Sequence, residues 1–327
     1  MHPCFYIEVI SGVLASAKVP DPANVHYPSC DSTEAEEAAI LAQDYINAHH
    51  TRGYKYALNQ IDEFKIIDKP DGQKTYLMEL DLLDTTCHVL NPTPVANCTV
   101  RPKYETNIEA DCDVVLNWDK GVLTVQAFKC KSKPESREFP CGGCVELLPL
   151  NDTSGLELVK VSVAAVNDKS TLPPERAYFD LLEVGRLSSQ IVGGGPKILA
   201  EFVVVETNCT ISDHDDSCAH GDHATASKIF CTSVQLPNEA ATVECKDIVT
   251  ADVAGLPQHH HHHDHQPHLK HHKMIALHDP HNTSLLSESG ESAEVPKVRR
   301  EAVLMLPLFP AATRGPAPVC PGKVRFF

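Results

Sequence analysis

Apolar and polar residues alternate with a period near two over residues 77–82. Leucines there alternate with Glu79 and Asp81, a pattern typical of a half-buried strand that carries both carboxylates on its solvent face. Asp84 would join them only if the strand bulges or bends. These three acids are our candidates for a calcium- or mineral-binding surface. Ordinary acidic decoration of a solvated strand is the alternative interpretation.

A period near 3.6 residues occurs in two other stretches, each just after a residue that can cap a helix. The first helix is expected after Asp31 or Ser32, and its apolar stripe is Ala35, Ala38, Ala39, Ala42 and Ile46. The second is expected after Asp152 or Thr153, with the stripe Leu156, Val159, Val163 and Val166. Strand-like runs follow each helix, at 114–116 and 122–128 and then at 178–184 and 198–206. The repeated order indicates a duplication and an α+β fold.

Composition limits the classes of partner. The chain has 327 residues with 24 prolines and one tryptophan, which suggests two modest domains and a part that is not packed core. Its net charge of -16 disfavours nucleic acid and anionic membranes as partners, and favours cations, mineral or basic proteins. The sequence contains no run of 18 apolar residues, so it predicts no membrane span.

Cysteines and glycosylation sequons place the chain in the secretory pathway. There are 13 cysteines, and N-x-S/T sequons occur at Asn97, Asn151, Asn208 and Asn282. Residues 1–17 are expected to be a signal peptide that ends at Ala15-Ser16-Ala17, although Glu8 interrupts its apolar segment. Cleavage after Ala17 would remove Cys4 and leave an even number of cysteines.

A resemblance to a known family rests on four segments. The run T-T-C-H-V-L-N-P-T-P-V-A-N-C-T-V-R at 85–101 is the most specific, and residues 32–63, L-L-P-L-N at 147–151 and V-C-P-G-K-V-R-F-F at 319–327 extend it. These segments resemble the fetuin-A branch of the fetuin family, within the cystatin superfamily. The resemblance implies two tandem cystatin-like domains, each with a long helix packed on an antiparallel sheet, followed by a disordered His/Pro-rich C-terminal region. We therefore expect a linker at 18–29, domains at 30–140 and 141–250, and an irregular tail at 251–327.

The resemblance also implies a function. Fetuin-like proteins of this branch are secreted, extracellular plasma glycoproteins that bind calcium and calcium phosphate and inhibit ectopic mineralisation. The chain is accordingly expected to be a monomeric, non-enzymatic carrier that requires no cofactor. Spacing and the fetuin pattern together imply the disulfides Cys30-Cys320, Cys87-Cys98, Cys112-Cys130, Cys141-Cys144, Cys209-Cys218 and Cys231-Cys245.

Protease inhibition is the alternative function. Gln190, Val192 and Gly194 match Q-x-V-x-G, the first hairpin loop with which inhibitory cystatins enter a cysteine protease. Cys141-Gly142-Gly143-Cys144 resembles a segment of metalloprotease-inhibiting fetuins, although glycines replace the usual proline. A glycine-rich hairpin that merely keeps an ancestral pattern, and a purely structural disulfide, are the plainer interpretations. A redox or zinc role for this C-x-x-C is less favoured, because no β-α-β pattern and no second C-x-x-C accompany it.

The region beyond residue 250 predicts metal binding and processing rather than a packed core. Histidines that could bind Zn²⁺ are His259, His260, His261, His262, His263, His265, His268, His271 and His272. Ser289 and Ser292 fit the S-x-E pattern of secretory phosphorylation, and Arg299-Arg300 offers a dibasic cleavage site. Motifs such as G-x-S-x-G and H-E-x-x-H are absent from the sequence, so no catalytic residues are assigned.

Overall fold

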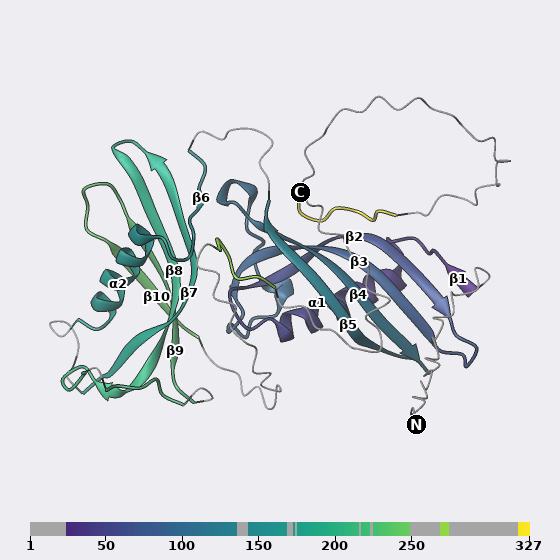
Figure 1. Ribbon diagram of the computed structural model, residues 1–327, viewed down its shortest axis with the longest axis horizontal. Coiled ribbons are helices and arrows are strands. Elements are labelled where there is room, and N and C mark those ends of the chain that lie inside the picture. The colour runs from purple at the N-terminus through teal and green to yellow at the C-terminus, as the bar shows by residue number, and fades with distance from the viewer. Residues whose placement is uncertain are drawn as a thin grey trace, which may run out of the picture.

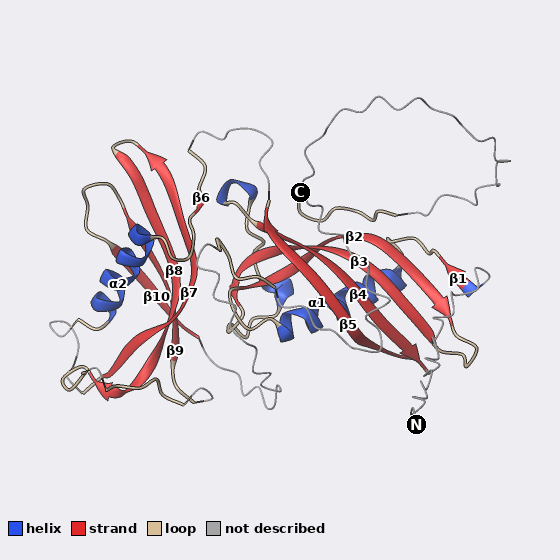
Figure 2. Ribbon diagram, viewed as in Figure 1, coloured by secondary structure: helices blue, strands red, loops and turns tan. Residues whose placement is uncertain are grey.

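The computed structural model describes residues 24–135, 143–168, 173, 175–215, 217–222, 225–248, 269–274 and 320–327. These residues form two antiparallel five-stranded sheets, each accompanied by one α-helix (Figure 1). Colouring by secondary structure shows the same helix-and-sheet unit twice (Figure 2). The α+β fold expected from the sequence is therefore confirmed. The expected signal peptide at 1–17 lies outside the described residues.

The first sheet has the strand order β1-β2-β3-β4-β5. Its elements are β1 (Val25–His26), α1 (Thr33–His49), β2 (Tyr54–Asp68), β3 (Lys74–His88), two short 3₁₀ helices (Val95–Asn97 and Lys103–Glu105), β4 (Ile108–Asp119) and β5 (Val122–Pro134). β1 pairs with the far end of β2, so part of the segment expected to be a linker at 18–29 belongs to this sheet.

Helix α1 begins where its cap can bond. The Ser32 hydroxyl accepts a hydrogen bond from the Ala35 backbone N–H at 3.2 Å, which satisfies one of the free donors of the first turn. The alanine stripe is fully buried, and its small side chains let the helix lie close to β2–β5. At the other end, the Asn47 side chain donates to the Tyr56 carbonyl and accepts from the Tyr56 N–H, both at 2.8 Å.

The second sheet has the order β10-β9-β8-β7-β6. Its elements are β6 (Glu146–Leu147), α2 (Thr153–Val166), β7 (Ala177–Val192), β8 (Gly195–Thr210), β9 (Lys228–Gln235) and β10 (Thr242–Ile248). Asp152 caps α2 by accepting from the Gly155 N–H at 3.0 Å. Asn167 joins the helix end to Phe179 with the same pair of hydrogen bonds that Asn47 makes, which supports duplication.

Disulfides and the C-terminal segment complete the framework. Five of the six implied pairs are present: Cys30–Cys320, Cys87–Cys98, Cys112–Cys130, Cys209–Cys218 and Cys231–Cys245. Cys144 is also disulfide-bonded, but Cys141 lies outside the described residues. Residues 320–327 lie along β2, where the Gly322 N–H donates to the Ile61 carbonyl at 2.8 Å. Among the described residues, no helix is both long and apolar enough to cross a membrane.

Candidate functional site

The outward face of the first sheet, on the side away from α1, carries a grid of carboxylates. On β3, Met78 and Leu80 are buried in the core with α1, while Glu79 is exposed on the other side. Strand register places Glu79 between Glu63 on β2 and Asp113 on β4. We call this grid the acidic face; its members are Asp62, Glu63, Glu79, Asp81, Glu109, Asp111 and Asp113.

Three of these acids converge. Asp81 lies opposite Asp111 across β3 and β4, and carboxylate oxygens of Asp81, Glu109 and Asp111 all lie within 4.8 Å of one another. Burial, together with the nearby carboxylates, raises the pKa of Asp81 to about 6, although the hydrogen bond from Asn59 acts in the opposite direction. Burial and neighbouring acids also raise the pKa values of Glu79 and Asp62. The face therefore concentrates carboxylates close enough together to raise one another's pKa values.

Asp84 does not belong to this face. The β2–β3 register shifts between Asp81 and Leu82, but the extra residue is on β2, and β3 pairs with β4 without a shift from Asp81 to Leu83. Alternation along β3 therefore places Asp84 on the opposite side from Asp81. Its side chain is fully buried, accepts a hydrogen bond from the Ile108 N–H at 2.6 Å, and lies 3.3 Å from Arg101 Nε and 3.7 Å from Arg186 Nη1. The bend that would have brought Asp84 to the acidic face is absent.

Asp84 instead belongs to the junction between the domains. Arg101 donates two hydrogen bonds to Glu201, at 3.0 and 2.9 Å, and the Tyr54 hydroxyl donates to the same carboxylate. Arg186 donates to the carbonyl of Thr106 at 2.8 Å. Burial alone would raise the pKa of Glu201, but the two guanidinium groups hold it below its ordinary value. The network fixes the second sheet against one end of the first.

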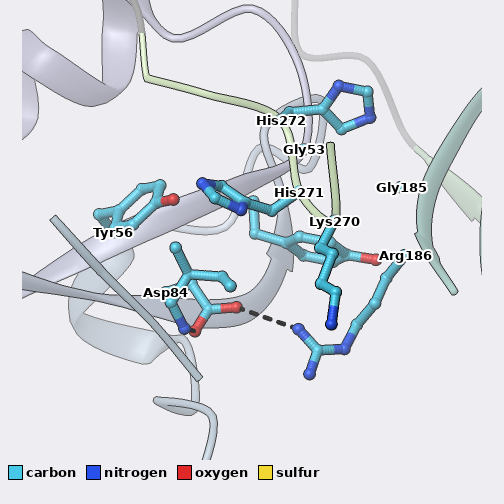
Figure 3. A pocket seen from close by; sticks show the side chains of 10 residues that line it. Gly53, Tyr56, Asp84, Gly185, Arg186, Lys270, His271 and His272 are labelled. Carbon is cyan, nitrogen blue, oxygen red and sulfur yellow. Dashed lines mark hydrogen bonds and ion pairs between the residues drawn. The ribbon is translucent and has the colours of Figure 1, made fainter. Parts of the chain in front are cut away.

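His271 and His272 lie in this junction rather than in an unstructured tract. His272 Nε2 is 2.8 Å from the Val184 carbonyl oxygen and 3.3 Å from Glu183, and His271 Nε2 is 3.1 Å from Ser132 Oγ. Both residues line a small cavity of about 10 Å³. Figure 3 shows their side chains with others that line it. Burial lowers the pKa of His271 to about 4.

Residues 269–274 therefore form what we call the junction clasp. Met274 is buried in the core of the first domain, with its sulfur 3.9 Å from Cys112 Sγ, and the Leu269 carbonyl accepts from the Leu150 N–H at 2.9 Å. The only signal for this docking in the amino-acid sequence is a pair of apolar residues, Leu269 and Met274, at the two ends of a polar stretch. The other seven candidate ligands, His259 to His263, His265 and His268, lie outside the described residues.

The Q-x-V-x-G match occupies the tip of the β7–β8 hairpin. Gln190 donates to the Gly143 carbonyl at 2.6 Å, so Gly143, in the described part of the C-x-x-C segment, lies beside this hairpin. Ile191 is 71% exposed at the tip, and Gly194 has φ +108°, a conformation that favours glycine. Val192 is half-buried. The structure thus brings together the two segments that sequence reasoning assigned to inhibition.

Modification sites divide into two groups. The side chains of Asn97, Asn151 and Asn208 are exposed, as glycan attachment requires. Asn282, Ser289, Ser292, Arg299 and Arg300 lie outside the described residues and stay sequence predictions.

Comparisons with known proteins identify relatives over most of the chain. Alpha-2-HS-glycoprotein from Mus musculus is 33% identical over 330 residues, which cover 91% of each sequence. The protein of the same name from Homo sapiens is 38% identical over 237 residues, which cover 71% of this chain and 63% of the human protein. No protein-family model matches the sequence.

Solved structures agree with the sequence relatives. Mouse fetuin-B in complex with crayfish astacin has a TM-score of 0.58 and 25% identity, covering 72% of both chains. Mouse fetuin-B in an inhibitory complex with human meprin beta has a TM-score of 0.59 and 25% identity, covering 70% of this chain and 76% of the other. With 33% identity across 91% of the mouse glycoprotein and a fold that matches fetuin-B, this chain belongs to the fetuin family.

Proposed function

We propose that this secreted, non-enzymatic fetuin binds calcium ions and nascent calcium phosphate through the acidic face and keeps the mineral colloidal. The observation that supports this most directly is the register of β2, β3 and β4, which sets Glu63, Glu79 and Asp113 in one row and Asp81 beside Asp111 in the next. The charge of -16 makes calcium a favourable partner for the whole chain.

The geometry of a sheet suits a mineral surface. Outward residues on one strand repeat about every 6.5 to 7 Å, and residues on neighbouring strands lie about 4.5 to 5.5 Å apart. A flat array with these spacings presents carboxylates to several calcium ions at once without enclosing each of them. Such an array favours clusters and crystal surfaces over single free ions.

A precipitation assay tests the proposal. The variant Glu79→Gln with Asp113→Asn removes two charges from the exposed row and leaves the shape of both side chains. We expect it to raise the protein concentration needed for half-maximal inhibition of calcium phosphate precipitation by about fivefold, because the removed charges face the mineral directly.

The matched control removes two exposed acids elsewhere. Glu37→Gln with Glu157→Gln takes the same charge from the surfaces of α1 and α2. An equal loss in both double variants would show that net charge, and not the acidic face, carries the activity. Glu36 is unsuitable as a control because its carboxylate binds Arg325.

Protease inhibition is the second candidate, supported by a specific contact. Gln190 donates a hydrogen bond to the Gly143 carbonyl, so the described end of the C-x-x-C segment lies beside the β7–β8 hairpin, whose tip is exposed. The fetuin-B structures that this chain resembles hold astacin and meprin beta. We therefore propose that this edge, formed by the hairpin tip and Gly143, contacts a metalloprotease.

Inhibition assays separate the two candidates. Inhibition of an astacin-type enzyme that is lost in Cys141→Ser with Cys144→Ser would support contact through this edge, since neither substitution touches a residue of the acidic face. Inhibition of a papain-type enzyme that is lost in Val192→Asp would support the cystatin-type loop instead. Full mineral inhibition without either activity would leave only the first candidate.

A further inference from the structure

The C-terminal segment, residues 320–327, lies along the outer edge of β2 (yellow in Figure 1). The Gly322 N–H donates to the Ile61 carbonyl at 2.8 Å, and the Arg325 N–H donates to the Asn59 carbonyl at 3.1 Å. The outer edge of a sheet presents backbone groups that can pair with another chain. The segment therefore occupies a part of β2 where an added strand could bind.

Helix α1 adds acidic contacts beside this edge. The Glu36 carboxylate accepts two hydrogen bonds of 2.6 Å from the Arg325 guanidinium, and the Asp31 side chain accepts from the Lys323 N–H at 2.8 Å. Gly322 is buried, and a Cβ at this residue would lie 3.1 Å from Asp31 Oδ1. The edge thus suits an extended segment that has a glycine and, three positions later, an arginine.

Apolar burial contributes little to the docking of this segment. Val324, Phe326 and Phe327 are 51%, 46% and 41% exposed. Backbone hydrogen bonds, one ion pair and the Cys30–Cys320 disulfide hold the segment instead. Another extended peptide can make the same non-covalent contacts, so the disulfide gives the protein's own segment its advantage.

The second domain holds a distant segment at the equivalent position. The register shifts after Leu58 and Ile61 of β2 recur after Leu181 and Val184 of β7. The Ile61 carbonyl accepts from the C-terminal segment, and the Val184 carbonyl oxygen lies 2.8 Å from Nε2 of His272 in the junction clasp. Irregular edges of this kind are commonly conserved because they serve a purpose. Both domains use this one to bind a segment that is far away in the sequence.

Gln60 and Glu183 are the equivalent side chains between these register shifts. Gln60 donates to the Gly322 carbonyl at 2.6 Å, and Glu183 accepts from the Gly53 N–H at 2.7 Å. In each domain this side chain therefore binds the backbone of the docked segment.

We propose that the β2 edge at residues 59–61 is a docking site for an extended basic peptide segment of another protein, and that the C-terminal segment is its built-in occupant. The partner segment adds to the sheet by backbone hydrogen bonds and places an arginine on Glu36, as Arg325 does within the chain. While Cys30 and Cys320 are joined, the protein's own segment keeps the site closed, because the tether gives it a high effective concentration.

Fluorescence anisotropy of a labelled peptide tests the proposal. The probe is residues 319–327 with the substitution Cys320→Ser, V-S-P-G-K-V-R-F-F. The full-length variant Cys30→Ser/Cys320→Ser/Arg325→Glu, which we call the open variant, loses the tether and the ion pair of its own segment. We expect the open variant to bind the probe about tenfold more tightly than the wild-type protein, because its site is free.

Cys209→Ser/Cys218→Ser is the matched control, since it removes a disulfide of the second domain and leaves the C-terminal segment in place. This control should bind the probe as weakly as the wild type does. A probe with Arg325→Glu should bind the open variant about tenfold more weakly, because Glu36 repels it. No binding of the original probe to the folded open variant would overturn the docking site, and equal binding to the wild type would overturn the built-in occupant. Equal binding of both probes would overturn the preference for a basic segment.

Hydrogen exchange gives a second measurement in case the open variant does not fold, which thermal unfolding verifies. Arg325→Glu alone keeps every disulfide. It should raise the exchange rates of the Gly322, Lys323 and Phe326 amides by about tenfold, because these amides are protected only while the segment is docked. Rates equal to those of the wild type would overturn a displaceable occupant held by Glu36.

Discussion

The two domains share a fold but use the outward face of the sheet in opposite ways. Leu80 on β3 lies opposite Cys112, and Phe202 on β8 lies opposite Cys231, so the two sheets can be compared position by position. In this alignment, three acidic-face positions of the first domain correspond to an apolar or basic residue of the second: Asp81 to Val203, Asp111 to Phe230, and Glu109 to Lys228.

Burial explains the difference. In the second domain this face is covered by the first: Val203 is fully buried, and the Phe230 ring lies 5.9 Å from His88 and 6.4 Å from Tyr54. In the first domain the second domain does not cover the same face, and charged side chains such as Glu63 and Glu79 are exposed there. The comparison shows that the two copies of the domain keep the same core and helix caps. Contact with the neighbouring domain decides whether the outward sheet face has charged or apolar side chains.

Exchanging the equivalent residues should give the largest effect. Val203→Asp places a charge in the covered face without a partner and should lower the free energy of unfolding by about 4 kcal/mol, measured by chemical denaturation. Val203→Thr, similar in shape but uncharged, is the control and should lose less. A loss below about 1 kcal/mol in Val203→Asp would show that the face is not sealed by the junction.

The reverse exchange should act in the other direction. The pKa of Asp81 is raised in the folded protein, so its ionised form opposes folding above about pH 6, and this cost disappears below its ordinary value of 3.8. Asp81→Val should therefore raise the free energy of unfolding by about 1 to 2 kcal/mol near neutral pH, and the gain should vanish near pH ~4. A gain independent of pH would mean that packing, and not charge, causes it.

The junction clasp contacts both domains, and removing its buried side chain should have an intermediate effect on stability. Met274→Ala removes a buried side chain from the first domain and should cost about 2 kcal/mol of unfolding free energy.

Deleting residues 258–268 instead should abolish retention on immobilised nickel near neutral pH while leaving stability unchanged, because the clasp remains. Retained nickel binding in that deletion would show that the tract is not the metal-binding segment.

The smallest effect is expected where the C-terminal segment contacts helix α1. Arg325 donates two hydrogen bonds of 2.6 Å to the Glu36 carboxylate. These hydrogen bonds are the main reason why the pKa of Glu36 is lowered. A lowered carboxylate pKa stabilises the fold above the unfolded value of 4.5, and the contribution is lost as pH falls through the folded value. Glu36→Gln should cost about 0.5 kcal/mol near neutral pH and nothing in acid. An undiminished cost in acid would point to shape rather than charge.

Sequence patterns located the helices better than the ends of the strands. The alanine stripe and the caps Ser32 and Asp152 predicted both helices, because capping and helical periodicity are local properties. The strands proved longer than the predicted runs: β7 and β8 extend to a turn at Gly193-Gly194. Strand ends depend on pairing with distant residues, which alternation along one strand does not reveal.

The candidate site was predicted in part. Glu79 and Asp81 lie on the same face of the sheet as alternation indicates, but only Glu79 is exposed to solvent and Asp81 is buried. Asp84 lies in the junction, and Glu109 and Asp111 were missed. A signal for the missed pair existed in E-A-D-C-D at 109–113, where acids alternate with small or buried residues. That strand could not be matched to β3 without knowing the register.

The sequence by itself determined the duplicated helix-and-strand order, the cysteines that hold it together, the acidic charge and the family. Each of these follows from local periodicity, residue type or a contiguous motif. Only the tertiary structure decided which acids meet, that Asp84 and His272 lie between the domains, and that one sheet face is open while its counterpart is covered. These features depend on contacts between residues that are far apart in the sequence, such as Asp84 with Arg186 and Glu183 with His272. No local pattern encodes the free energies of such contacts.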